Sequence, residues 1–279
     1  MLDHGYDLPL YLQFVIISFV GLILGSFATA LTYRIPRNIP WAFNTKKGQE
    51  SAYHSSCPNC KTPLTPLDLV PFFSWLFLGG KCRHCAEKIT TIYPAVELGV
   101  LLMCLASLAV WGFTLPLLWI VLASPFLMSL MAIDIEKMIL PNQLVLIVFI
   151  LGLLNHLSSY FLGQRQLDDF LINYALGALL YGGFSWFLGW AVSKVLKKEA
   201  MGFGDVKFFA ATGMWLGIES LANFCLLSGV LGIMASLIWK IFVSTHLKSS
   251  VFPFGPALIL SFFILFHLDG SHLLEFILK

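Results

Sequence analysis

Long stretches almost without charge recur along this chain, and they restrict its fold more than any other feature. Each is about 20 residues long, which lets one helix cross about 30 Å of hydrocarbon. Charged residues make up only 11% of the 279 residues, whereas soluble domains carry about 25%. We therefore predict an all-α polytopic membrane protein with about eight transmembrane helices. The expected spans are 11–33, 92–111, 115–133, 139–161, 170–192, 205–222, 224–244 and 253–268.

The basic residues indicate how these helices cross the membrane. The segment 34–91 contains eight of the 17 lysines and arginines, and threading eight helices from an outside N-terminus places that segment inside. Most other basic residues then fall on the same side, with only Arg165 and Lys279 opposite. Because cytoplasmic loops carry an excess of Lys and Arg, we expect both termini outside.

Four cysteines stand in the one sizeable polar insert, 34–91. They form two pairs separated by 21 residues, "CPNC" with Cys57 and Cys60 and "CRHC" with Cys82 and Cys85. Two such turns are typical of a zinc ribbon, because each brings two thiolates to one ion and together they complete a tetrahedral site. Such a site is structural and does not indicate a reaction. Redox pairs or disulfides are the alternative, although stable disulfides are uncommon on the cytosolic side expected here.

Two aspartates carry charge at unusual places in so apolar a chain. Asp205 stands in "GFGDVK" at the start of the sixth span, and Asp134 stands in "AIDIEK" at the end of the third. The expected topology brings both to the inner membrane surface. Two facing carboxylates can share a proton and activate water for peptide hydrolysis, one as base and the other as acid. Gly202 and Gly204 would let a substrate or a facing helix come close to the backbone.

A plainer interpretation stays open, in which both aspartates are helix-end charges near the lipid headgroups. The helix ends also suggest a division of roles. Asp205 at a helix N-terminus would be the resting base, and Asp134 near a helix C-terminus would be the resting acid.

Together these residues resemble the bacterial type IV prepilin peptidases. The resemblance covers nearly the whole chain and implies an inner-membrane aspartic peptidase with the catalytic pair Asp134 and Asp205. Members cut the basic leader of a prepilin or pseudopilin at the cytoplasmic face and then methylate the new N-terminal amine with S-adenosylmethionine. The matching segments are "GSFATALTYRIPR" (25–37), "CPNC", "CRHC", "ITTIYPAVEL" (89–98), "IDIEKMILPNQL" (133–144), "GFGDVKFFA" (202–210) and "FPFGPAL" (252–258).

The resemblance implies three parts of the chain. These are a first transmembrane helix (11–33), a cytoplasmic four-cysteine insert (34–91) and a seven-helix membrane peptidase core (92–268). The expected location is the bacterial inner membrane with the N-terminus in the periplasm. The expected partners are prepilins or pseudopilins and membrane lipid, with no nucleic acid. Zinc is expected in the insert, with iron as the open alternative, and S-adenosylmethionine is the expected co-substrate.

The methyltransferase prediction rests mainly on the four-cysteine insert, since family members without it tend to be peptidases only. No G-x-G-x-x-G loop follows a strand, so the cofactor site of common soluble methyltransferases is absent. Glu97, about one turn into the second span, is the candidate for binding S-adenosylmethionine. The alternative is that Glu97 caps a backbone group or pairs with a lysine.

Two residues depart from the family pattern. Thr29 stands in "GSFATA" where Asn is common, and Asn142 follows Pro141 where Asp is common. Because neither belongs to the catalytic pair, we expect at most a difference in local substrate contacts.

Three other classes of protein share part of this pattern. An intramembrane protease of the presenilin type has the GxGD motif but lacks a four-cysteine insert. A zinc-ribbon scaffold or transporter would leave the aspartates without a catalytic role. A quinone-linked thiol oxidoreductase would need its cysteines at the outer face.

Overall fold

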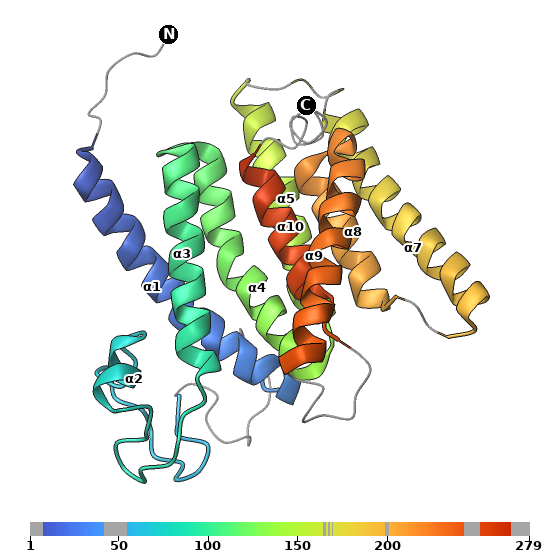
Figure 1. Ribbon diagram of the computed structural model, residues 1–279. Helices are drawn as coiled ribbons and strands as arrows, with labels where there is room; N and C mark the ends of the chain where they lie inside the picture. The colour runs from blue at the N-terminus through green and yellow to red at the C-terminus, as the bar shows by residue number, and fades with distance from the viewer. Residues whose placement is uncertain are drawn as a thin grey trace. The chain divides into compact units, whose positions relative to one another are not determined.

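The computed structural model describes residues 8–41, 55–163, 166, 168, 170–198, 201–242 and 252–268. Part of the predicted insert (42–54), Arg165, Lys279 and the last two residues of the predicted span 224–244 lie outside these residues. Within the described part the chain is helical, and its only β-structure is two isolated bridges in the cysteine insert. The all-α prediction is therefore confirmed (Figure 1).

Six helices among the described residues are long and apolar enough to cross a membrane, as expected for a multi-pass membrane protein. Each corresponds to a predicted span. The other two predicted spans form the shorter helices α8 (Phe203–Leu216) and α10 (Gly255–His267), so the count of eight crossings stays a prediction. The six long segments are Leu10–Arg37, Ile92–Trp111, Leu115–Lys137, Asn142–Phe161, Ile172–Leu196 and Ile218–Ile241.

Helix α8 ends earlier than the predicted span 205–222 because the chain turns at Gly217. The φ of Gly217 is +76°, a left-handed conformation that glycine adopts without steric cost. The 3-10 turn η3 (Ile218–Ser220) and helix α9 (Leu221–Phe242) follow directly. A helix of 14 residues is about 21 Å long, which is less than the hydrocarbon thickness.

The chain forms two compact units, Met1–Ser129 and Leu130–Lys279. In the first unit, α1 (Leu10–Arg34) packs on α3 (Ile92–Trp111) through small residues. A methyl group on Gly25 would stand 2.9 Å from the Cα of Glu97. Gly25 and Gly21 form a G-x-x-x-G pair, a spacing that lets two membrane helices approach closely.

Helix α2 and the first part of α4 also belong to the first unit. Helix α4 (Leu115–Lys137) begins in it, and the Ser129 hydroxyl donates a hydrogen bond to the Ala28 carbonyl of α1 over 3.0 Å. The short helix α2 (Phe73–Phe77) lies in the cysteine insert, and the 3-10 turn η1 (Ile35–Arg37) follows α1.

In the second unit, α8 packs against α5 (Asn142–Phe161), α7 (Leu176–Leu196) and α10 (Figure 1). Near the C-terminal end of α8, the indole N–H of Trp215 donates to the Val148 carbonyl over 2.8 Å. The π-helix η2 (Phe170–Ala175) precedes α7. A methyl group on Gly213 of α8 would stand only 2.6 Å from the carbonyl oxygen of Gly177 in α7. These contacts fix the C-terminal half of α8 among its neighbours.

We expect Gly213→Ala to lower the midpoint of thermal unfolding in detergent micelles. The added Cβ would meet the backbone of Gly177, which cannot move aside as a flexible side chain can. Overpacking of this kind costs about 1–3 kcal/mol. The matched control is Gly183→Ala in α7, where a Cβ meets nothing within 4 Å and alanine favours the helix by about 1 kcal/mol. Equal midpoints for the two variants would contradict close packing at Gly213.

Candidate active site and metal centre

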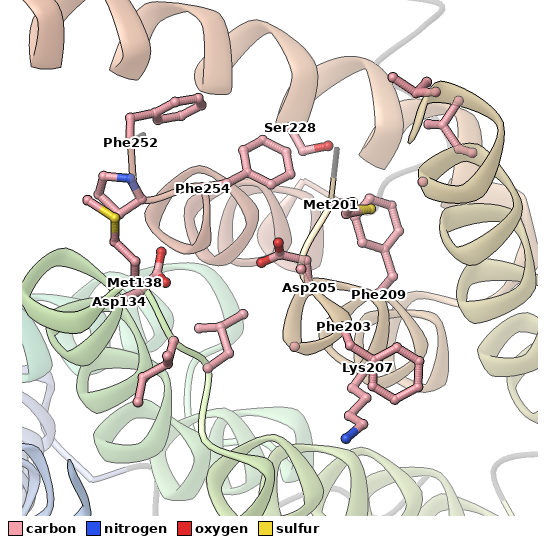
Figure 2. Close-up of a pocket in the computed structure, with 18 of the residues that line it drawn as sticks. Asp134, Met138, Met201, Phe203, Asp205, Lys207, Phe209, Ser228, Phe252 and Phe254 are labelled. Carbon is pink, nitrogen blue, oxygen red and sulfur yellow. The ribbon is translucent and has the colours of Figure 1, made fainter. Parts of the chain in front are cut away.

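A cavity of about 1030 Å³ lies in the second unit between the end of α4, the start of α8 and parts of α7 and α9. Asp134 and Asp205 both line it, and Figure 2 shows their side chains in the same cavity on two different helices. They are 71 residues apart in the sequence. The structure therefore places in one pocket the two aspartates that were predicted to act together.

Asp134 is buried and is held by the start of helix α10. Its Oδ2 accepts a hydrogen bond from the backbone N–H of Gly255 over 2.7 Å. A methyl group on Gly255 would stand 2.7 Å from the same oxygen, so a side chain there would displace the carboxylate. This role of Gly255 was not predicted from the sequence. The available signal was a glycine before a proline at the beginning of an apolar helix, since proline suits the first helical turn.

Each of the two aspartates lies beside a helix N-terminus. Asp205 lies in the first turn of α8, and Asp134 faces the N-terminus of α10. The hypothesis that Asp205 is the base and Asp134 the acid considered only the helix to which each residue belongs. Because a helix N-terminus lies beside each carboxylate, helix ends do not distinguish the two roles.

The glycines around Asp205 leave room for two different neighbours. A methyl group on Gly202 would stand 3.2 Å from Oδ2 of Asp205 itself. A methyl group on Gly204 would stand 3.1 Å from the Cβ of Leu140, which belongs to the turn between α4 and α5. Gly202 therefore makes space for the carboxylate, and Gly204 lets the facing turn approach α8 closely.

The rest of the cavity is largely apolar. Two ionised carboxylates in such surroundings repel each other and lose hydration. The arrangement suits an acid and a base acting on one water molecule. The apolar lining residues are Met138, Ile139, Leu140, Phe184, Leu188, Val192, Met201, Phe203, Phe209, Phe252, Pro253 and Phe254.

The four cysteines of the insert form a compact cluster in the first unit. The sulfur atoms of Cys57, Cys60, Cys82 and Cys85 all lie within 4.8 Å of one another, and those of Cys57 and Cys85 are 3.8 Å apart. A zinc ion with Zn–S bonds of about 2.3 Å holds its sulfurs about 3.8 Å apart in a tetrahedron. The cluster therefore fits a four-thiolate zinc site, as expected for a zinc-ribbon-like insert after the first helix.

The two C-x-x-C turns repeat the same backbone geometry. In each, the N–H of the first cysteine donates to the carbonyl five residues later: Cys57 to Thr62 over 3.0 Å and Cys82 to Glu87 over 2.8 Å. The residue after the second cysteine has positive φ in both turns, 57° at Lys61 and 56° at Ala86. This repeat could not be predicted from the sequence, because neither position is a glycine.

Glu97 lies in the second turn of α3 and has a backbone partner. Its Oε2 accepts a hydrogen bond from the N–H of Phe72 in the insert over 2.6 Å. Capping of a backbone group was the alternative to binding S-adenosylmethionine, and this contact supplies the capped group. A role of Glu97 in cofactor binding stays a prediction.

Asp68 joins the loop before α2 to the second C-x-x-C turn. Its carboxylate accepts hydrogen bonds from the hydroxyl and N–H of Thr65, over 2.7 and 3.0 Å, and from Nε of Arg83 over 2.8 Å. The Thr65 hydroxyl, followed by the Thr65 N–H and the Arg83 guanidinium, lowers the pKa of Asp68 from 3.8 to about 2.

Comparison with known proteins agrees with this geometry. Residues 19–112, which include the cysteine cluster, match the bacterial Peptidase A24 N-terminal domain, and residues 119–237, which include both aspartates, match the type IV leader peptidase family. No solved structure matches the chain.

Three curated relatives cover most of the chain. The prepilin leader peptidase/N-methyltransferase of Aeromonas hydrophila is 36% identical over 92% of this chain and 91% of its own length. The protein of the same name in Neisseria gonorrhoeae is 33% identical over 90% of this chain and 89% of its own length. The type 4 prepilin-like proteins leader peptide-processing enzyme of Escherichia coli O78:H11 is 32% identical over 85% of this chain and 87% of its own length. These matches favour the peptidase interpretation over the scaffold, transporter and thiol oxidoreductase interpretations.

We expect Asp68→Ala to speed trypsin cleavage within 55–91 at pH 7. The folded pKa of Asp68, about 2, lies below its ordinary value, so its carboxylate stabilises the insert at neutral pH. That contribution is lost only as the pH falls through the folded pKa. The control is Glu87→Ala, which removes an exposed carboxylate of the insert. Equal cleavage of the two variants would show that the Thr65–Asp68–Arg83 contacts do not hold the insert together.

Proposed function

This chain belongs to the type IV leader peptidase family of bacteria, and we propose that it removes the basic leader of type IV prepilins or pseudopilins and then methylates the new N-terminus. The observation that carries the proposal is the pair of carboxylates, Asp134 and Asp205, projecting from two helices into one cavity. The names of the relatives support both activities.

In the peptidase reaction the two aspartates share one proton and hold a water molecule between them. The ionised aspartate takes a proton from the water as it attacks the scissile carbonyl carbon, and the protonated partner donates to the carbonyl oxygen. The tetrahedral intermediate then collapses, and a carboxyl group gives its proton to the leaving amine. Each aspartate changes protonation state within one turnover, so the macroscopic titration belongs to the pair.

Three glycines help to orient the pair for this reaction. The Gly255 N–H fixes Asp134 from the start of α10, and Gly202 leaves space for the carboxylate of Asp205. Gly204 brings the turn at Leu140 against α8. Positioning of reacting groups lowers a barrier because their freedom has already been lost on folding. A displacement of any of these segments would therefore reduce cleavage more than it reduces stability.

The positive-inside distribution supports a cytoplasmic location for both aspartates and the insert, with the N-terminus in the periplasm. A basic leader on the cytoplasmic side of the membrane can reach such a site without crossing the hydrocarbon.

S-adenosylmethionine would be the methyl donor for the second reaction. The neutral amine released by peptide cleavage would attack the methyl carbon, the S–CH3 bond would break with S-adenosylhomocysteine as the leaving group, and the methylated amine would release one proton to solvent. The relatives' names and the cysteine insert support this activity, and Glu97 stays the candidate residue for the donor.

We expect Asp134→Asn and Asp205→Asn each to abolish leader cleavage, because an amide can neither take a proton from water nor share one with its partner. Purified protein, a prepilin-like peptide and labelled S-adenosylmethionine give both readouts. A pre-cut substrate should still be methylated by both variants. Glu136→Gln, which neutralises an exposed carboxylate on the same helix α4, should cut like the unmodified protein. Normal cleavage by both aspartate variants would make the aspartates helix-end charges.

We expect the purified protein to contain one zinc ion per chain. Cys82→Ser should lose it, because three thiolates and a hydroxyl hold zinc much more weakly than four thiolates. Cys225→Ser, which changes a cysteine outside the cluster, should keep it. Elemental analysis of the three proteins decides the question, and iron in place of zinc would contradict the assignment.

A further inference from the structure

The insert carries an exposed apolar surface that the proposed activities do not use. Between residues 67 and 77, six large apolar side chains are exposed, and Phe77 is 84% exposed. We call these residues the α2 surface: Leu67, Leu69, Val70, Phe73, Leu76 and Phe77. Exposed apolar side chains gathered in one short segment mark a site that another apolar surface covers.

The opposite side of α2 is fixed to the body of the insert. The indole N–H of Trp75 donates to the Ile89 carbonyl over 3.2 Å. A methyl group on Gly80 would stand 2.9 Å from the ring of Trp75, so the ring lies directly against that turn. Trp75 therefore points inward, while Phe73 and Phe77 point outward.

The segment before α2 is hydrogen-bonded to a membrane-spanning helix. Phe72 has a positive φ of 60° with a ψ of −50°, and its N–H donates to Glu97 over 2.6 Å. Glu97 is the sixth residue of α3, which places it about 8 Å along that helix from its first residue. The backbone of α1 also approaches Glu97, through Gly25. The hydrogen bond from Phe72 to Glu97 therefore holds α2 at the level where the spanning helices α1 and α3 lie together.

Figure 1 shows the same arrangement within the first unit. Helix α2 lies beside the first turns of α3, and the other loops of the insert extend beyond it. An apolar surface at the beginning of a spanning helix faces the boundary between headgroups and acyl chains. Aromatic and aliphatic side chains on short helices are stable in that layer.

We propose that the α2 surface inserts into the headgroup layer of the protein's own membrane, with phospholipid as its occupant. The lipid contact and the Glu97 hydrogen bond together set the height and orientation of the four-cysteine centre above the bilayer. The residues of this surface do not line the cavity of the aspartates, and the proposal does not depend on the peptidase reaction.

Photo-crosslinking in vesicles tests the proposal directly. The full chain carries p-benzoylphenylalanine in place of Phe77 and is reconstituted in vesicles of phosphatidylethanolamine and phosphatidylglycerol. After illumination, mass spectrometry identifies what is attached at residue 77, and we expect phospholipid as the dominant adduct. The matched control places the same group at His84, an exposed polar position on the second C-x-x-C turn. An unchanged thermal unfolding midpoint verifies that both proteins are folded.

The other outcomes overturn the proposal. Adducts to another part of the same chain or to a second protein would identify a protein surface as the occupant. No adduct at residue 77, or equal lipid adducts at 77 and 84, would show that the α2 surface has no specific place in the lipid.

The hydrogen bond between Phe72 and Glu97 of α3 is tested in the same assay. Combined with the residue 77 probe, Glu97→Ala should lose most of the lipid adduct, because the hydrogen bond from Phe72 to α3 is then lost. Glu97→Gln should retain it, because the amide oxygen still accepts the Phe72 N–H. Equal adducts in the two variants would show that Glu97 does not set the depth of α2.

Discussion

The first turn of α8 must present a carboxylate inside an apolar membrane domain, and the rest of the second unit depends on how that short helix is held. Fourteen residues make too short a helix to be placed by the bilayer alone. The C-terminal end supplies the missing constraint. The Trp215 indole donates to the Val148 carbonyl of α5, and a methyl group on Gly152 would come within 2.6 Å of its ring. Fixing one end of a stiff helix fixes the other, so Asp205 is positioned partly by a tryptophan three turns away.

The sequence predicted the helices well because their main determinant is local. Apolar residues over about 20 positions require a helix in a membrane, since only intrahelical hydrogen bonds satisfy the backbone there. The turn at Gly217 and the role of Gly255 could not be predicted, because both depend on segments distant in sequence. Gly217 reads as part of an apolar run, and Gly255 is required only because Asp134 lies against it. The pairing of the aspartates was accessible because the topology places the two helix ends on one side.

In the cysteine insert, too, one feature can be predicted from the sequence and another cannot. Four cysteines in two C-x-x-C pairs indicate a shared ion, since few other arrangements use that spacing. The positive φ values at Lys61 and Ala86 leave no trace in the sequence. Left-handed backbone at residues other than glycine costs about 1 kcal/mol each. A bound ion would compensate for this cost, which is consistent with a module that depends on its metal for stability.

The two departures from the family pattern have different physical consequences. Thr29 donates its hydroxyl to the Ser26 carbonyl within α1 over 2.7 Å, so its polar group is satisfied inside its own helix. Asn142 accepts a hydrogen bond from Nζ of Lys207 over 2.8 Å, and Lys207 also lies 4.7 Å from the centre of the Phe203 ring. An aspartate at position 142 would make the same contact and cancel the charge of the lysine. The amide of Asn142 keeps the hydrogen bond between the start of α5 and the start of α8. Unlike a carboxylate, it does not compensate the positive charge of Lys207. Asn142 and Lys207 both line the cavity of Asp134 and Asp205, so the uncompensated positive charge lies at the wall of that cavity. The substitution thus preserves the geometry of the site and changes its electrostatics.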